Sequence, residues 1–390
     1  MLSWAQVELL IESVLELPDA PPSRWHRPGI GPRRERWFER VSAVVLLTFA
    51  VGWCWTLVHG AARTDAAGNG DVQPTVGARL AAALTAADAP AMAYLTDAAL
   101  AAVTPLRGES GRLRARFETG EARLPVDSLP PGASVAIASP RDTIAVAGDS
   151  AAATAPKPGL WNLVVRAGTV IKPVADFTVV TMVPTSARRN GRIGLYYIGN
   201  WPTERGRVAA RGNYAPPRGF IEVTRENQDT RVSEHFRLRD FLTKNQQDVW
   251  PKYLVLETRL LDKLELVLAD LEKRGIRTHG VKVMSGFRTP SYNASGGNTA
   301  GRASLSRHMY GDASDIYIDS DGNGMMDDLN GDGRVNTADA RVILQAAERV
   351  EREHPALVGG VGVYSYGPGH GPFIHIDTRG FRARWVGAGE

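Results

Sequence analysis

Two histidines and a carboxylate in the C-terminal third of the chain have the types and spacing of a metal site. His308 and Asp315 lie seven positions apart, and the β-branched and aromatic run Ile316–Ile318 directly after them predicts a strand. Phe373–Asp377 predicts a second strand, in which alternate side chains share a face, so His375 would point the same way as both ends of that run. Two histidines and a carboxylate can hold zinc tetrahedrally and leave the fourth position to water. These residues are therefore candidates for a catalytic zinc site.

The blocks that contain these residues occur in an order known from one protein family. Ser306–Asp315 reads Ser-x-His-x-x-Gly-x-Ala-x-Asp, and a strand that carries His375 follows downstream. Upstream stands Ser285–Pro290, with the pair Tyr292–Asn293 after it. Together they resemble the zinc D-Ala-D-Ala carboxypeptidase family, which has the hedgehog/DD-peptidase fold. The resemblance extends over residues 233–385.

The resemblance implies a fold, a site and an activity. The fold would be α+β, with an antiparallel sheet and packed helices in a zinc peptidase domain at 233–390, and the activity would be hydrolysis of peptide bonds in peptidoglycan stem peptides or cross-links. His308, Asp315 and His375 would be the zinc ligands. Arg288 and Ser306 would bind the substrate, with the planar guanidinium of Arg288 matching the carboxylate of the peptide. A loop-capping role for Arg288 is the alternative.

The acid/base group of such a reaction is harder to identify. A side chain must take a proton from water and pass it to the leaving amine. Known members of the family carry a carboxylate three residues before the last zinc-ligand histidine, where this chain has Pro372. The remaining candidates are Asp377, on the ligand's face of the strand, and His370, in a glycine-rich loop. Asp377 has a second interpretation, in which it orients a metal ligand from behind.

This departure from the family pattern leaves a second hypothesis for the whole protein. Members of the same clan have lost activity and become zinc-stabilised binding modules. The alternative function is therefore a catalytically inactive cell-wall anchor that grips stem peptides through Arg288. A scaffold with a purely structural zinc is a third hypothesis, which the open fourth coordination position disfavours.

A calcium-loop pattern lies in an insertion between the two predicted site strands, at residues 319–339. Oxygen-bearing residues stand at positions 1, 3, 5, 9 and 12, with glycine at position 6, and a helix is predicted directly afterwards, over 338–352. The ligands would be Asp328, Asn330, Asp332, the backbone carbonyl of Arg334, Asn336 and Asp339. The carboxylates of such a loop repel one another without a cation, so the pattern predicts a structural Ca²⁺.

The segment before this loop repeats its first nine positions. The repeat supplies Asp319, Asp321, Asn323 and Asp327 as ligands of a second calcium ion. Its position 12 would fall on Asn330, which the following loop also uses. Two complete sites would therefore overlap, so the sequence predicts one complete loop and one half-loop.

The N-terminal part carries the signature of a membrane anchor. The apolar run 41–58 is about as long as a bilayer crossing, and Arg33, Arg34, Arg36 and Arg40 precede it. Positive charge on this side predicts that residues 1–40 stay in the cytoplasm and that the remainder lies outside the inner membrane, in the periplasm. The alternative is a cleaved signal peptide, although about 40 residues before the apolar run are more than such peptides usually have.

Composition and periodicity divide the remaining chain. The chain has 390 residues and a net charge of +4, which gives no reason to expect a nucleic-acid partner, and its single cysteine excludes an internal disulfide. Residues 59–110 are alanine-rich and predict a linker or helical spacer. Residues 111–186 alternate and are β-branched, which predicts a small β-sandwich. Residues 187–232 are rich in loops and aromatics and predict a connecting segment that covers the catalytic domain. Within the catalytic domain, leucines at helical spacing over 253–274 predict a core helix.

Overall fold

The computed structural model of the chain describes residues 89–120, 124–126, 129–139, 143–147, 156–206, 214–296, 299, 302–367 and 369–387, which belong to one compact unit. The predicted cytoplasmic segment at 1–40, the predicted span at 41–58 and the first part of the predicted linker lie outside these residues. No helix in the described part is both long and apolar enough to cross a membrane.

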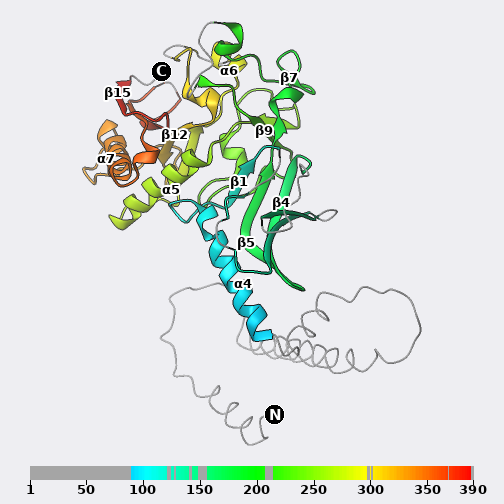
Figure 1. The fold of residues 1–390 in the computed structure, drawn as a ribbon. Helices are drawn as coiled ribbons and strands as arrows, with labels where there is room; N and C mark the ends of the chain where they lie inside the picture. The colour runs from blue at the N-terminus through cyan, green and yellow to red at the C-terminus, as the bar shows by residue number, and fades with distance from the viewer. Residues whose placement is uncertain are drawn as a thin grey trace, which may run out of the picture. The chain divides into compact units, whose positions relative to one another are not determined.

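The C-terminal half is built on a five-stranded sheet (Figure 1). In spatial order its strands are β11 (Val281–Ser285), β12 (Ala313–Ile318), β14 (Phe373–Asp377), β13 (Gly360–Tyr364) and β15 (Ala383–Gly387). Neighbours are antiparallel except for β13 and β15, which are parallel. Both predicted site strands are present and adjacent, so the sheet itself brings their side chains together. The fold is α+β, with several largely antiparallel sheets and few helices.

Two amphipathic helices accompany this sheet. α5 (Thr258–Lys273) and α7 (Thr337–Glu353) contact each other, and α7 also contacts β13 and β14. The predicted helices at 253–274 and 338–352 are thereby confirmed, although α5 begins later than predicted because Lys252–Leu254 forms strand β10. Asn336 and Asp339 cap α7 reciprocally, which satisfies backbone N–H groups that the first turn of a helix leaves unpaired.

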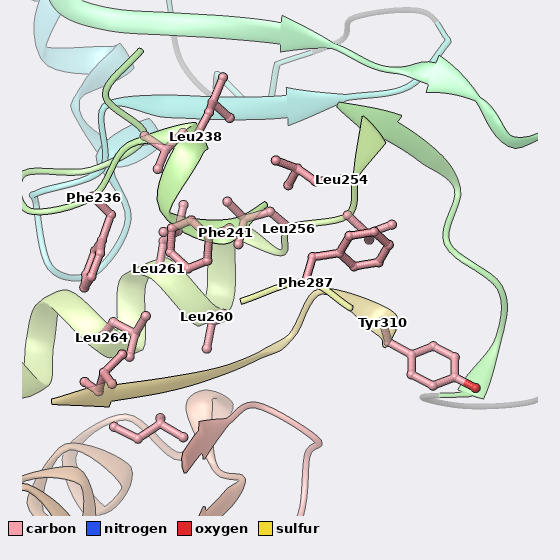
Figure 2. Close-up of a cluster of buried hydrophobic side chains, with 14 of the residues drawn as sticks. Phe236, Leu238, Phe241, Leu254, Leu256, Leu260, Leu261, Leu264, Phe287 and Tyr310 are labelled. Atoms are coloured by element: carbon pink, nitrogen blue, oxygen red, sulfur yellow. The ribbon is translucent and has the colours of Figure 1, made fainter. Parts of the chain in front are cut away.

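The main hydrophobic core lies where α5 meets the aromatic side chains before it (Figure 2). Leucines recur along α5 at helical spacing, and those facing inward are fully buried. The side chains drawn around them are Phe236, Leu238, Phe241, Leu254, Leu256, Leu260, Leu261, Leu264, Phe287 and Tyr310. Burial of apolar area is the main stabilising contribution here, worth roughly 1.5–3 kcal/mol for each large side chain. Phe241 and Phe287 join this core to the loop that follows β11.

The predicted β-sandwich at 111–186 is wrong, because the described residues from 115 to 181 form a single five-stranded sheet. The spatial order is β1 (Ala115–Glu118), β5 (Val170–Thr181), β4 (Gly159–Ala167), β2 (Ala133–Ala138) and β3 (Thr143–Ala147). Instead of a second sheet, helix α4 (Ala89–Val103) packs on β2, β4 and β5. Alternation along a strand reveals a buried face but carries no information about which element covers it.

Helix α4 also changes the interpretation of the predicted linker at 59–110. Ala99 and Val103 are buried in a second core cluster together with Val135, Leu163 and Phe177 of the sheet. Small alanine side chains let a helix approach a sheet closely, so this alanine-rich stretch is a packed element over its described length. Residues 89–103 are helical, as the helical-spacer alternative predicts, and they pack on the sheet.

The sheet of β1–β5 shares the main core with the C-terminal half. Leu113, Ala115 and Val180 belong to the main cluster rather than to the cluster beneath α4. Just before β1, the backbone N–H groups of Glu109 and Ser110 each donate to the carboxylate of Asp262 on α5, both at 2.8 Å. A shared core and a charge-assisted clamp hold these parts of the chain as one unit.

Short elements connect the two halves. A three-stranded sheet has the order β10 (Lys252–Leu254), β9 (Gly219–Val223) and β6 (Val183–Pro184), and β7 (Arg192–Ile193) pairs with β8 (Tyr196–Tyr197). The short 3-10 helices outside the site are η2 (Thr104–Arg107), η3 (Thr185–Ala187), η4 (Pro202–Arg205), η6 (Leu238–Phe241) and η8 (Pro355–Leu357).

Candidate metal centre

The site is organised on one row of residues across all five strands of the C-terminal sheet. Ser285, Asp315, His375, Gly362 and Trp385 are successive register partners. Paired residues on neighbouring strands present their side chains on the same face. Gly362 has no side chain, and a Cβ there would lie 2.3 Å from the Trp385 ring, so the glycine leaves room for the indole. The indole ring lies 5.2 Å from the ring of His375 and forms a wall beside it.

His308 reaches this row from a short helix before β12. Ser306 is the N-cap of η7 (Arg307–Tyr310), and Gly311 ends it with φ of +73°, a left-handed conformation that favours glycine. A Cβ at Gly311 would also lie 2.5 Å from the backbone of Val255. The glycine in the His-x-x-Gly pattern therefore has a steric reason, because it turns the chain from the ligand-bearing helix into β12.

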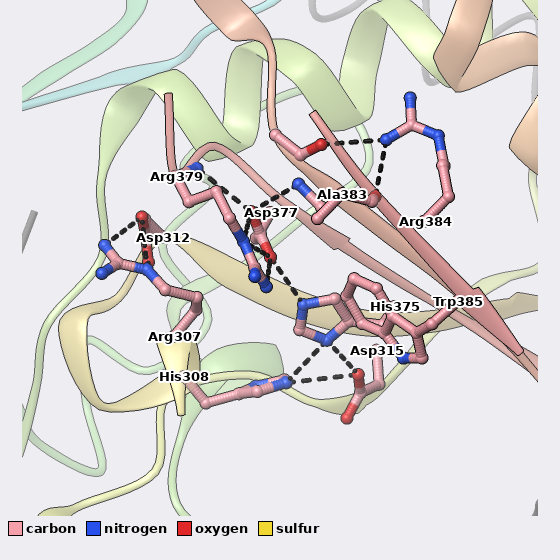
Figure 3. Close-up of polar contacts among 12 residues, drawn as sticks. Arg307, His308, Asp312, Asp315, His375, Asp377, Arg379, Ala383, Arg384 and Trp385 are labelled. Atoms are coloured by element: carbon pink, nitrogen blue, oxygen red, sulfur yellow. Dashed lines mark hydrogen bonds and ion pairs between the residues drawn. The ribbon is translucent and has the colours of Figure 1, made fainter. Parts of the chain in front are cut away.

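Three ligand atoms converge between these elements (Figure 3). The distance from His308 Nε2 to His375 Nδ1 is 3.1 Å, and Asp315 Oδ1 lies 3.2 Å from His308 Nε2 and 2.9 Å from His375 Nδ1. All three side chains are buried. The residues predicted to form one site are thus brought together in a cluster that could hold a metal ion.

Each histidine is oriented by a hydrogen bond on the side of its ring away from the cluster. His308 Nδ1 lies 2.7 Å from the carbonyl of Gly286, and His375 Nε2 lies 2.9 Å from Asp377 Oδ2. Both partners are acceptors, so these two nitrogens carry the protons and the other two present lone pairs to the cluster. Three acceptor atoms that face one another need a positive charge between them, which a metal ion or a proton can supply.

The pKa values of the cluster follow from this arrangement. Burial and the nearby Arg288 charge lower the pKa of His308 to about 4. Burial opposes the charged form of Asp315, but His308, His375 and Arg288 hold the pKa of this carboxyl well below its usual range. Burial likewise opposes the charge on His375, but Asp315 and Asp377 raise the pKa of this imidazole. At neutral pH the cluster therefore offers an ionised carboxylate and a neutral His308.

Asp377, one of the two acid/base candidates, lies behind His375 rather than in front of it. Its side chain is fully buried. Besides the bond from His375, its oxygens accept from the backbone N–H of Gly360 at 2.7 Å and from the backbone N–H and Nε of Arg379 at 3.0 and 2.9 Å. Burial opposes its ionisation, but His375 and Arg379 keep the pKa of Asp377 far below its usual range. An ionised, saturated carboxylate in this place orients the histidine, as the second interpretation of Asp377 held.

Arg288, predicted to receive the substrate, is engaged with the cluster. Its Nη2 lies 2.7 Å from Asp315 Oδ2, the oxygen turned away from the histidines, and its Nε donates to Ser285 Oγ at 2.8 Å. Part of the guanidinium fork is thereby occupied by a residue of the cluster. Ser306, the other predicted substrate residue, is nearly buried at the edge of the same cleft.

A cleft of about 990 Å³ opens over the cluster. Its lining includes His308, Asp315 and His375 together with Arg288, Ser306 and His370. His370 is half-buried on the wall formed by the loop before β14, with Nδ1 2.7 Å from the carbonyl of Gly371. Phe373 lies under it, stacked on Tyr364 at a ring distance of 4.5 Å. Of the two acid/base candidates, His370 is therefore the one that lines the cleft.

Several residues outside the motifs support the site. The fully buried Trp201 donates its indole N–H to the carbonyl of Met309 at 3.0 Å and so fixes η7 next to His308. Arg379 holds Asp377, as described above. Lys244 lies exposed at the cleft, where desolvation and the Arg288 charge lower its pKa. Arg379 stands two residues after Asp377 and therefore had a local signal in the sequence. Trp201 and Lys244 had none, because they lie far from the motifs in the chain.

The two halves of the acidic insertion differ in geometry. Asp319, Asp321 and Asp327 bring ligand atoms to within 4.8 Å of one another. Asp328, Asp332 and Asp339 do not form such a group, although all three lie in the described part of the chain. Asp339 is fully buried and accepts from the backbone N–H groups of Leu329, Asn330 and Asn336. The predicted half-loop is thus the more compact cluster, and the predicted complete loop is closed by its own backbone.

Comparison with known proteins adds no assignment to this geometry. No protein-family model matches the chain, and neither a curated protein nor a solved structure matches it.

Proposed function

We propose that the protein is a membrane-anchored zinc metallopeptidase that hydrolyses peptide bonds of peptidoglycan stem peptides or cross-links, as a carboxypeptidase or an endopeptidase. The observation that carries this proposal is the convergence of His308, Asp315 and His375 at the base of an open cleft. The resemblance to the zinc D-Ala-D-Ala carboxypeptidases supplies the substrate class and the hedgehog/DD-peptidase fold. The predicted span at 41–58 supplies the location, with the catalytic part in the periplasm.

The donor set fits zinc. In a tetrahedral site with bonds of about 2.0–2.1 Å, ligand atoms lie roughly 3.3 Å apart. The three separations here are 2.9, 3.1 and 3.2 Å, and both histidines already present a lone pair to the centre. Two imidazoles and one carboxylate with an open fourth direction are typical of catalytic zinc. Bound zinc would polarise a scissile carbonyl and lower the pKa of water.

The remaining chemistry falls to side chains of the cleft. His370 would take the proton from the attacking water and pass it to the leaving amine, because it lines the cleft and Asp377 does not. Arg288 and Lys244 would bind the substrate carboxylate, with Lys244 providing the charge that Arg288 shares with Asp315. Trp385 and Phe373 would exclude water from one side of the bound peptide.

One observation favours the alternative, a zinc-stabilised cell-wall binding module without activity. The position at which family members carry their acid/base carboxylate is Pro372, which can neither accept nor donate a side-chain proton. In this alternative the same cleft grips a stem peptide through Arg288 and Lys244 and cleaves nothing.

We also propose that the insertion at 319–339 binds calcium as a structural ion, on the strength of its loop pattern. This second metal site is separate from the zinc site, because the insertion contributes no ligand to the histidine cluster.

The test is incubation of the full-length, zinc-loaded protein with purified sacculi, followed by chromatography of the muropeptides. We expect shortened or uncross-linked muropeptides from the wild type and none from His308→Ala. His279→Ala is the matched control, because His279 is an exposed histidine outside the cleft. Unchanged muropeptides together with retained sacculus binding would establish the binding module instead.

The acid/base assignment has its own variant. His370→Gln removes the titrating group but keeps a polar side chain of similar reach, and should lower kcat by about 10²–10⁴-fold while zinc content stays unchanged. An unaltered rate would exclude His370 from proton transfer.

A further inference from the structure

Asp319, Asp321 and Asp327 form the second carboxylate cluster of the described chain. They belong to the loop directly after β12, the strand that carries Asp315. Their ligand atoms lie within 4.8 Å of one another, although Asp319 is buried, Asp327 half-buried and Asp321 exposed. Three carboxylates at this distance repel one another unless a cation lies between them.

Asp319 adds an observation that does not depend on clustering. It is only 5% exposed. Its Oδ2 accepts from the backbone N–H of Gly324 at 3.1 Å, but its Oδ1 is buried without a hydrogen-bond partner among the described residues. A buried carboxylate oxygen without a partner is costly, and such a group in a native protein calls for a missing ligand. An ion at the cluster would complete the coordination of this oxygen.

In the neighbouring loop, 328–339, the carboxylates of Asp328 and Asp339 accept hydrogen bonds from backbone N–H groups. Asp328 accepts from the backbone N–H groups of Gly331, Asp332 and Gly333. Asp339 accepts from three further backbone N–H groups and serves as the capping residue of α7. The ion therefore belongs to the first half of the insertion, which the loop pattern alone ranks second.

This half of the insertion also touches the wall of the cleft. In the order of a calcium loop that starts at Asp319, the backbone carbonyl at position 7 is that of Met325. Gly371 is buried against this residue, since a Cβ there would lie 2.9 Å from Met325 Cε. The other half of the insertion also contacts this wall, since Tyr366 donates its hydroxyl to the carbonyl of Val335 at 3.1 Å. Gly371 directly follows His370, so an ion that fixes Met325 also fixes the segment that carries His370.

We infer that Asp319, Asp321 and Asp327 hold a calcium ion that fixes residues 369–372 of the cleft wall and thereby shapes the cleft over the histidine cluster. The inference rests on the proposed binding of calcium by the insertion. It does not depend on the proposed peptidase reaction, because it concerns the geometry of the cleft wall.

The first experiment is calorimetric titration of Ca²⁺ into the full-length, zinc-loaded protein after removal of calcium. Asp319→Asn and Asp328→Asn are a matched pair, because each removes one charge at the first position of its loop. We expect a single ion in the wild type, affinity about tenfold or more weaker in Asp319→Asn, and affinity nearly unchanged in Asp328→Asn, since carboxylate count tunes calcium affinity. Weakening by Asp328→Asn equal to or greater than that by Asp319→Asn would overturn the assignment.

The second measurement is hydrogen exchange of peptides that cover residues 364–373. Calcium should slow exchange there in the wild type and in Asp328→Asn but have no effect in Asp319→Asn. Unchanged exchange in the calcium-bound wild type would overturn the link to the cleft wall. If Asp319→Asn does not fold, as judged by loss of its zinc, the exposed Asp321→Asn replaces it with the same expected outcomes.

The outcomes separate this inference from the proposals on which it rests. Absence of calcium binding in the wild type would refute both the inference and the calcium proposal. The peptidase proposal is tested separately, by whether His308→Ala abolishes the cleavage of muropeptides. The two tests are distinguishable because no residue is common to the two clusters.

Discussion

The histidine cluster and the acidic insertion each gather metal-ligating side chains into a small volume, yet they are built in opposite ways. The cluster draws its ligands from η7, β12 and β14, and His308 and His375 stand 67 positions apart. The insertion draws its acidic side chains from one continuous stretch, 319–339. The first depends on a folded sheet, whereas the second depends on the local turns of a loop.

The two regions also differ in how their side chains are held. Both histidines of the cluster are locked by an acceptor on their far side, Gly286 for His308 and Asp377 for His375. In the insertion, the acidic side chains mainly bind backbone N–H groups of their own loop. A centre supported from outside is already arranged for its ion, whereas a loop gains part of its order from the ion itself. The following variants test this difference between the two regions.

The largest effect is expected from His375→Ala, which removes one of the three ligands of the cluster. Zinc content, measured by elemental analysis of the full-length protein, should fall from one ion per chain to nearly none. Asp332→Asn is the control, because it removes one charge from the insertion and should leave the zinc content unchanged. Retention of zinc by His375→Ala would refute the ligand assignment.

A smaller effect is expected from Asp377→Asn, which leaves all three ligands in place. The variant weakens the acceptor that fixes the tautomer of His375, so zinc affinity should fall by about 10–100-fold. Competition with a fluorescent chelator measures this change. An unchanged zinc affinity in the variant would mean that His375 is ordered without its hydrogen bond to Asp377. The cluster would then not depend on support from outside.

Asp339→Ala tests whether the insertion can be destabilised without a change in the histidine cluster. Three backbone N–H groups lose their acceptor, so the free energy of unfolding should fall by about 1–3 kcal/mol, as judged by denaturant titration. Zinc affinity should stay at the wild-type value, because Asp339 belongs to the second loop and the start of α7. A parallel loss of zinc would show that the two regions are not independent.

The smallest effect concerns pH and lies outside both regions. Burial lowers the pKa of His235, but Glu265, 2.7 Å away, and Glu272 raise it above its ordinary value. A base whose pKa is raised by folding stabilises the protein fully below about pH 6.5, and this contribution is lost as the pH rises through the folded-state pKa. Unfolding free energy should therefore fall by about 1 kcal/mol or less over this interval, and by less in His235→Gln. An identical pH dependence in both proteins would contradict the assignment.

Prediction from sequence succeeded where the information was local. The periodic leucines predicted α5, the calcium-loop pattern predicted the helix that follows it, α7, and the β-branched runs predicted β12 and β14. Alternation also predicted a β-rich region at 111–186 but led to a sandwich, because it does not reveal that α4 covers the buried face of the sheet.

In the candidate site, too, the sequence predicted what depends on local residues and not what depends on tertiary packing. Residue type and spacing were sufficient to name His308, Asp315 and His375 and to mark the two halves of the insertion, because ligand chemistry and turn geometry are written in short motifs. Packing alone established that Arg288 contacts Asp315, that Asp377 stands behind His375, and that Trp201 secures η7. These contacts join residues far apart in the chain, and their partners become neighbours only when strands, helices and loops are assembled around a common core.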